Sequence, residues 1–211
     1  MLSENLFLKI DSCLMIENTP SYQLRVFAQQ VWFKKQPFAL LLQQIKTGQS
    51  PVYHPEGNVW NHTLMVVDEA AKRKQYSQNP RVLMWAALLH DVGKPAVTKI
   101  RRGRITAYDH DKVGEKLAEA FLFELTEQTD FIAPVTALVR YHMQPLYVEK
   151  SLPFQDIAGL KRCCDVREVA LLSYCDRLGR LGADTQAETQ ATKMFLKKCG
   201  ERTDLPWLKP E

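Results

Sequence analysis

Hydrophobic residues recur along most of the chain at the three-to-four-residue spacing of helices that bury one apolar face. This spacing predicts helices over 3–16, 21–33, 37–47, 61–78, 80–91, 111–126, 129–143, 166–181 and 185–199. The Pro- and Gly-containing segment 48–57 predicts a loop. Residues 98–108 instead alternate like short strands around Arg102-Gly103, which predicts a β-hairpin. The pattern therefore predicts an all-α helical bundle with one short hairpin.

The stretch Arg81 to Pro95, "RVLMWAALLHDVGKP", is nearly continuous in apolar residues and then reaches His90 and Asp91. Gly93 and Pro95 are typical of the end of a helix. A carboxylate taken out of water costs several kcal/mol unless another group compensates its charge. The partners of His90 and Asp91 must therefore come from elsewhere in the chain.

The composition is that of a globular protein, with 211 residues, 45% hydrophobic and 25% charged positions, and a formal charge of +4. That charge suits anionic substrates but is smaller than that of a typical nucleic-acid-binding domain. No apolar run is long enough for a membrane span, and the charged N-terminal segment predicts an amphipathic helix rather than a signal peptide. Five cysteines without a paired Cys-x-x-Cys spacing indicate reduced thiols, so we expect a cytoplasmic protein without membrane association.

Several predicted helices place an ionisable side chain on the apolar face. His62 shares its face with Val66, and His110, His142 and Asp176 lie on the apolar rows of three other helices. A single inward histidine is usually a hydrogen-bonded core residue, and an inward carboxylate can cap a neighbouring helix. Together with His90-Asp91 the pattern is better explained by one shared cause. Imidazoles and carboxylates that converge without thiolates indicate a central divalent metal site.

The order His62, His90-Asp91, Asp176 resembles the ligand order of the HD superfamily of metal-dependent phosphohydrolases, and "HDVGK" (90–94) is similar to its central motif. A narrower resemblance is to the HD domain attached to bacterial CCA-adding tRNA nucleotidyltransferases. Its segments are 54–71, 88–95, 108–119, 139–145 and 176–180. The chain lacks the expected Asp-x-Asp strand of the nucleotidyltransferase domain, because its one such motif, Asp109–Asp111, encloses His110 at a helix start. Unaided addition of CCA is therefore not expected.

The resemblance implies one or two divalent ions, which could be Mn, Fe, Co, Ni or Mg. It assigns the first site to His62, His90, Asp91 and Asp176. It assigns the second site to Asp91, His110 and His142, with Asp91 as a bridge. It also implies an HD domain over 51–199, preceded by a helical extension (1–50) that packs on it and followed by a tail (200–211).

The implied activity is hydrolysis of a phosphate ester or phosphodiester of a nucleotide or RNA end, with 2′,3′-cyclic phosphates among the candidates. Asp91 and Lys94 are the expected catalytic residues, although Lys94 could instead be an exposed cation near a helix C-terminus. Lys94, Arg177 and Arg180 are the expected substrate-binding residues. Both arginines could equally form structural ion pairs with Asp109, Asp111 or Glu115.

Other residues near the motifs carry weaker expectations. His54 is expected in solvent rather than at the metal. Trp60 and Tyr108 could stack on a base, but core packing is favoured for both. The cations at 99, 101, 102 and 104 could contact phosphates, but a solvated loop is favoured.

Two other functions use the same residues. One is a nucleotide- or tRNA-binding accessory module with a structural metal, and the other is a di-iron oxygenase. The expected partners are a phosphorylated small molecule or nucleotide, or a tRNA or RNA end. The sequence leaves the oligomeric state open.

Overall fold

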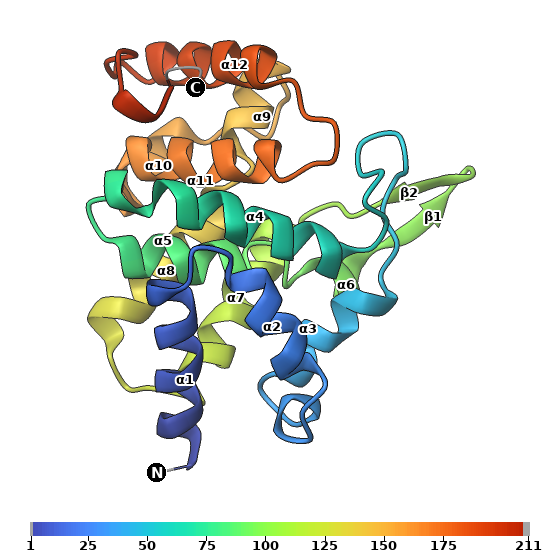
Figure 1. Cartoon of the computed structure of the whole chain (residues 1–211). Coiled ribbons are helices and arrows are strands. Elements are labelled where there is room, and N and C mark those ends of the chain that lie inside the picture. The colour runs from blue at the N-terminus through green and yellow to red at the C-terminus, as the bar shows by residue number, and fades with distance from the viewer. Residues whose placement is uncertain (1, 209–211) are drawn as a thin grey trace.

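The computed structural model describes residues 2–208 of the chain, and side chains from residue 4 onward. The last three residues of the expected tail lie outside this range. The α-helices are α1 (Leu2–Ile16), α2 (Pro20–Ala28), α3 (Ala39–Gln43), α4 (Val59–Arg73), α5 (Pro80–Leu89), α6 (Lys94–Val97), α7 (His110–Phe123), α8 (Thr129–Tyr141), α9 (Gln144–Glu149), α10 (Ile157–Cys163), α11 (Val166–Leu178) and α12 (Thr185–Lys198). The predicted all-α fold is confirmed (Figure 1).

Polar caps fix where three of the site-bearing helices, α4, α5 and α11, begin. The side chain of Asn58 accepts a hydrogen bond from the amide of Asn61 at the start of α4. Asn79 caps α5 in the same way, and Asp165 caps α11. Such caps satisfy amide groups that have no partner within the helix, and each contributes about 1 kcal/mol.

The short elements are the ones that the hydrophobic spacing did not resolve. The predicted helix 21–33 ends at Ala28 and is followed by the 3₁₀ turn η1 (Trp32–Lys34), and 37–47 is divided into α3 and η2 (Gln44–Lys46). Helices α6, α9 and α10 were not predicted. They span only one or two turns, and a periodic pattern needs a longer window to be visible.

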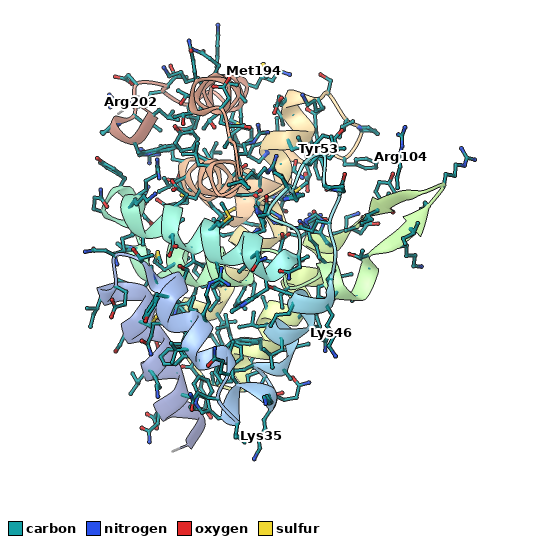
Figure 2. All side chains as sticks on the ribbon, turned by 45° about the vertical axis from the view of Figure 1, so that its right-hand side comes forward. Lys35, Lys46, Tyr53, Arg104, Met194 and Arg202 are labelled. Atoms are coloured by element: carbon teal, nitrogen blue, oxygen red, sulfur yellow. The ribbon has the colours of Figure 1, made fainter. Side chains whose placement is uncertain are left out.

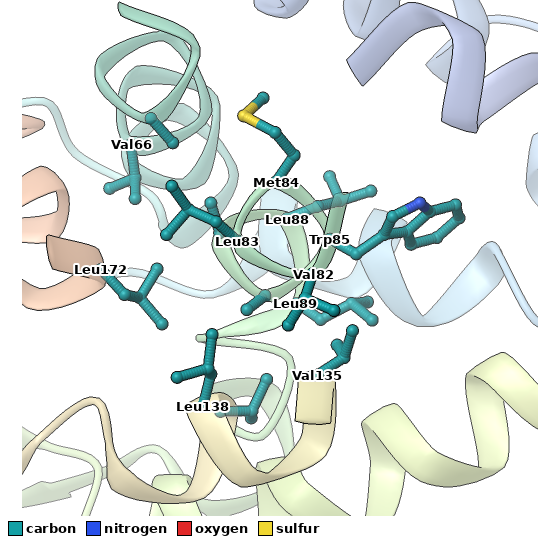
Figure 3. Packing of buried hydrophobic residues seen from close by; sticks show 14 of the residues in the cluster. Val66, Val82, Leu83, Met84, Trp85, Leu88, Leu89, Val135, Leu138 and Leu172 are labelled. Carbon is teal, nitrogen blue, oxygen red and sulfur yellow. The ribbon is translucent and has the colours of Figure 1, made fainter. Parts of the chain in front are cut away.

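Helix α5 runs through the middle of the core, and every residue from Val82 to Leu89 is buried. Figure 3 shows its side chains against Val66 of α4, Leu138 of α8 and Leu172 of α11. Full burial of one aliphatic side chain contributes about 1.5–3 kcal/mol. This packing anchors α5, so His90 and Asp91, which directly follow it, lie in the interior, exposed by 0% and 1%.

The predicted hairpin is present as β1 (Lys99–Arg101) and β2 (Arg104–Thr106), which pair antiparallel. Arg102 and Gly103 both adopt positive φ, as a tight two-residue hairpin turn requires. The hairpin projects from the helical body beside the loop that precedes α4 (Figure 1). There a methyl group added to Gly48 would lie 3.9 Å from Cδ1 of Ile105.

No helix within residues 2–208 is long and apolar enough to cross a membrane. All five cysteines are free thiols.

Candidate metal centre

Five helices bring the six expected ligands together in the interior. His62 lies on α4, His90 and Asp91 follow the last residue of α5, His110 begins α7, His142 follows α8, and Asp176 lies on α11. Each of the six is at most 6% exposed. Residues far apart in the sequence thus form one buried polar cluster, which we call the histidine–aspartate cluster.

Asp91 lies at the centre of this cluster, and its two oxygens face different histidines. Oδ2 lies 3.3 Å from Nε2 of His90 and 4.0 Å from Nε2 of His62. Oδ1 lies 3.4 Å from Nε2 of His110 and 3.9 Å from Nε2 of His142. Two groups with metal-ligand spacing therefore share Asp91, one with His62 and His90 and one with His110 and His142.

Asp176 extends the first group. Its Oδ1 lies 2.9 Å from Nε2 of His62, and the guanidinium of Arg180 lies 3.8 Å from the same oxygen. Burial disfavours a charged Asp176, but Arg180 and His62 outweigh this effect and hold its pKa well below the usual range.

Local hydrogen bonds set the ring orientation of three histidines. Nδ1 of His90, His110 and His142 donates to the backbone carbonyl three residues earlier, at 2.8, 2.8 and 2.7 Å. With the proton on Nδ1, each ring presents the lone pair of Nε2 towards the cluster. Metal-binding histidines are commonly oriented in this way.

His62 is oriented by a residue that the sequence analysis missed. Its Nδ1 lies 2.9 Å from Oε1 of Glu56, which also accepts a hydrogen bond from Nδ1 of His54 at 2.8 Å. Burial alone would raise the pKa of Glu56, but its contacts with His62, its own backbone and His54 lower it to about 2. The expectation that His54 lies in solvent was wrong, because its side chain is only 14% exposed.

The pKa shifts of His142 and Asp91 suit metal ligands. Burial, aided by the nearby His110 and His90, lowers the pKa of His142 to about 3, so its ring is neutral near pH 7. Burial opposes the charge of Asp91, but Lys94 and His90 keep its pKa well below the ordinary value. Neutral imidazole and ionised carboxylate are the forms that bind a cation.

Two glycines permit the close approach of the helices that carry the ligands. A methyl group on Gly93 would lie 2.1 Å from the carbonyl oxygen of His110, so only glycine lets the end of α5 meet the start of α7. A methyl group on Gly179 would lie 2.7 Å from Cγ2 of Val66, where the end of α11 crosses α4. Gly93 belongs to the "HDVGK" motif, and this close packing explains why the motif has a glycine at that position.

A divalent cation fits this arrangement. Nε2 of His90 is buried and has no hydrogen-bond partner among the described residues. A buried polar atom in that state costs about 1–3 kcal/mol, which a bound ion would offset. Neutral imidazoles with carboxylates and no thiolate suit several first-row divalent ions.

Four residues of the cluster line an open cleft with a volume of about 1200 Å³. Its lining includes Asp91, His110, His142, Asp176, Lys94 and Arg180. Tyr53, Tyr108 and Phe154 also line the cleft, and they are exposed by 68%, 59% and 56%. Core packing of Tyr108 was therefore a wrong expectation, whereas Trp60 is in the core, exposed by 4%.

The structure separates the two candidate substrate-binding arginines. Arg180 lines the cleft, but Arg177 does not. The guanidinium of Arg177 instead donates to Glu188 of α12 and Glu149 of α9. The substrate-binding expectation for Arg177 is therefore corrected to a structural ion pair, because both terminal nitrogens of its guanidinium already donate to carboxylates. The acidic partners that had been expected belong to other cations: Asp111 and Glu115 lie near Arg140, and Asp109 near Lys112.

Comparison with known proteins identifies the family of the chain. The HD domain family model matches residues 59–181, which is more than half of the chain. The "Multifunctional CCA protein" of Actinobacillus pleuropneumoniae is 31% identical over 152 residues, covering 68% of this chain and 36% of the relative. The "CC-adding tRNA nucleotidyltransferase" of Thermus thermophilus is 32% identical over 130 residues, covering 61% and 29%. The chain thus spans about a third of the length of the curated relatives it matches.

The fold, the buried histidine–aspartate cluster and the family match define the class: this chain belongs to the HD domain family. That family is a superfamily of metal-dependent phosphohydrolases, and among its members the chain is similar to the HD portion of CCA-adding tRNA nucleotidyltransferases.

Proposed function

We propose that the chain is a phosphohydrolase that uses one or two divalent ions to hydrolyse a phosphate ester or phosphodiester of a nucleotide or RNA end. Esters of this class include 2′,3′-cyclic phosphates. The observation that carries the proposal is the position of Asp91, which lines an open cleft and whose two oxygens face two groups of imidazole Nε2 atoms.

In this proposal one ion is held by His62, His90, Asp91 and Asp176, and the second by Asp91, His110 and His142. A divalent ion there would make water more acidic and offset the negative charge of phosphoryl oxygens. Mn, Fe, Co, Ni and Mg all remain candidates for such a ligand set.

In this proposal two cations of the chain, Lys94 and Arg180, hold the substrate phosphate. Nζ of Lys94 lies 2.7 Å from Oδ2 of Asp91 and donates to Gln49 at 2.6 Å, at the edge of the cleft. Arg180 lies beside Asp176 and has a buried Nε without a hydrogen-bond partner among the described residues. Lys94 would also keep Asp91 ionised, and Arg180 would keep Asp176 ionised, because each places a positive charge beside the carboxylate.

Two observations favour a nucleotide or RNA end as the substrate. Exposed tyrosine and phenylalanine rings line the cleft, and such rings stack on bases. The relatives are named "Multifunctional CCA protein" and "CC-adding tRNA nucleotidyltransferase". We further propose that residues 51–199 form the catalytic domain and that 1–50 and 200–211 are appendages of it.

The test is a screen of purified protein for bound metal and for hydrolysis of bis-p-nitrophenyl phosphate, nucleoside monophosphates and 2′,3′-cyclic nucleotides. We expect turnover that depends on an added divalent ion. Asp91→Ala should lose metal, and its kcat/KM should fall about 1000-fold, because metal charge contributes several kcal/mol to such reactions.

Asp130→Ala is the matched control, because Asp130 is an exposed carboxylate in the first turn of α8. It should keep the metal and the activity. Full activity in Asp91→Ala would contradict the proposal. Tight RNA binding by a metal-loaded protein without turnover would favour an accessory binding module instead, and oxygen consumption by an iron-loaded protein would favour an oxygenase.

A further inference from the structure

The hairpin carries an unusual concentration of uncompensated positive charge. Its cations are Lys99, Arg101, Arg102 and Arg104. Within residues 2–208 none of the four has a salt-bridge partner, whereas Arg140, Arg167 and Arg177 each pair with two carboxylates. Figure 2 shows Arg104 on the arm that projects from the helical body.

The strand register makes this charge costly to the fold. Arg101 lies directly opposite Arg104, and like charges at facing positions destabilise a strand pair. The strands have three residues each, and every residue of β1 is exposed. An isolated two-stranded hairpin is only marginally stable in water. An anionic partner would remove the repulsion that the chain itself leaves in place.

The register also separates the two faces of the hairpin. Ile100 and Ile105 face one side, and Ile105 lines the cleft. Lys99, Arg101 and Arg104 share the opposite side, because facing residues of an antiparallel pair point the same way. The guanidinium of Arg101 lies 5.3 Å from the ring centre of Tyr108, which itself lines the cleft. The cationic side is thus continuous with the edge of the cleft through Tyr108.

We propose that this cationic side of the hairpin binds the phosphate backbone of a single-stranded RNA whose terminal nucleotide enters the cleft. The inference rests on the proposed function and names its substrate class as a polynucleotide end rather than a free nucleotide. Strands of three residues extend about 10 Å, so the distal cations lie beyond the reach of a mononucleotide phosphate held at the cluster. They match the phosphates that precede a terminal nucleotide, and Tyr108 can stack on a base between them.

The test is binding and turnover of a labelled single-stranded RNA of about 12 nucleotides, a length within the usual site sizes of such proteins. The variant replaces all four hairpin cations by glutamine, which also removes the Arg101–Arg104 repulsion and so should not unfold the hairpin. Four lost phosphate contacts should weaken RNA binding roughly 600-fold at about 0.1 M salt and reduce the salt slope by about 3. In the same variant, the ratio of the KM for RNA to the KM for the matching nucleotide should rise.

One control removes the same number of charges elsewhere. It replaces exposed lysines on η1, η2 and α12, or next to η1, by glutamine: Lys34, Lys35, Lys46 and Lys197. The second control, Ile100→Gln, alters the opposite side of the same hairpin without changing the charge. Both controls should bind RNA as the unaltered protein does.

RNA binding that is unaffected by the hairpin variant, or equally weakened by the remote lysine variant, would overturn the inference. No RNA binding by the unaltered protein would overturn it as well. Hairpin-dependent binding without hydrolysis of any phosphate ester would support the RNA surface while contradicting the proposed hydrolase, so the two failures can be told apart.

Discussion

Asp176 and Arg177 are consecutive residues of α11 and are equally buried, each 6% exposed, yet they belong to opposite kinds of polar cluster. Arg177, Glu149 and Glu188 form what we call the saturated cluster. Both terminal nitrogens of the Arg177 guanidinium donate to a carboxylate, and these bonds join α11 to α9 and α12. Asp176 belongs to the histidine–aspartate cluster, in which Nε2 of His90 has no partner among the described residues. Burial alone therefore does not distinguish a structural charge from a ligand.

The two clusters differ in whether all of their polar groups have a hydrogen-bond partner. A buried ion pair that is fully hydrogen-bonded needs nothing further, and removing one of its members leaves an uncompensated charge. The histidine–aspartate cluster has imidazole and carboxylate lone pairs without a hydrogen-bond partner, which a bound cation would complete. Stability should therefore depend on the first cluster in every condition and on the second only when metal is present.

The largest expected effect is on the saturated cluster. Arg177→Met should lower the free energy of unfolding by about 3 kcal/mol, because it leaves two carboxylates near the interior without their cation. The value lies at the low end of the range for buried pairs, since the side chains of Glu149 and Glu188 keep 18% and 19% exposure. Urea denaturation measures it. The metal content per folded molecule should not change. If Arg177→Met lost metal but kept its stability, Arg177 would belong to the metal site and not to a structural cluster.

Metal should stabilise the protein through the histidine–aspartate cluster alone. A divalent ion at 100 times its dissociation constant should add about 2.7 kcal/mol to the free energy of unfolding. Denaturation with and without the ion measures the increment. Arg177→Met should keep this increment and Asp91→Ala should lack it. An equal increment in Asp91→Ala would mean that the ion binds elsewhere.

Glu56→Gln tests whether the carboxylate beside His62 orients that ring. We expect a 10- to 100-fold loss of metal affinity, the usual cost of removing a group that orients a metal ligand. Calorimetric titration measures it. Glu168→Gln is the matched control, because Glu168 accepts hydrogen bonds from Ser77 and Gln78, away from the cluster. Equal affinity in the two variants would assign Glu56 no part in the site.

The smallest expected effect is a pH dependence of the saturated cluster. Burial opposes the charge of Glu149, but its hydrogen bonds to Lys150 and Arg177 lower its pKa below the ordinary 4.5. A depressed carboxylate pKa contributes stability above the unfolded value and loses it as pH falls through the folded value. The stability difference between the unaltered protein and Glu149→Gln should therefore narrow below about pH 4.5. A stability difference that stays constant down to pH 3 would show that folding does not lower the pKa of Glu149.

The sequence by itself predicted the fold class, the long helices, the hairpin and the six residues that meet in the interior. These features depend on local spacing, because a residue every three or four positions marks the face that a helix buries. The short helices α9 and α10 were missed since they span only two turns or less, and Glu56 was missed since a lone loop carboxylate has no periodic signal.

Only the tertiary structure decided which neighbouring polar residues face the cleft. Arg177 and Arg180 are both near Asp176 in sequence, but α9 and α12 supply carboxylates to the first and not to the second. Tyr108 is exposed, whereas His54 is largely buried against Glu56 and the ring of His62, which no local pattern encodes. Helix periodicity fixes the direction of a side chain, whereas its surroundings depend on segments that are distant in sequence.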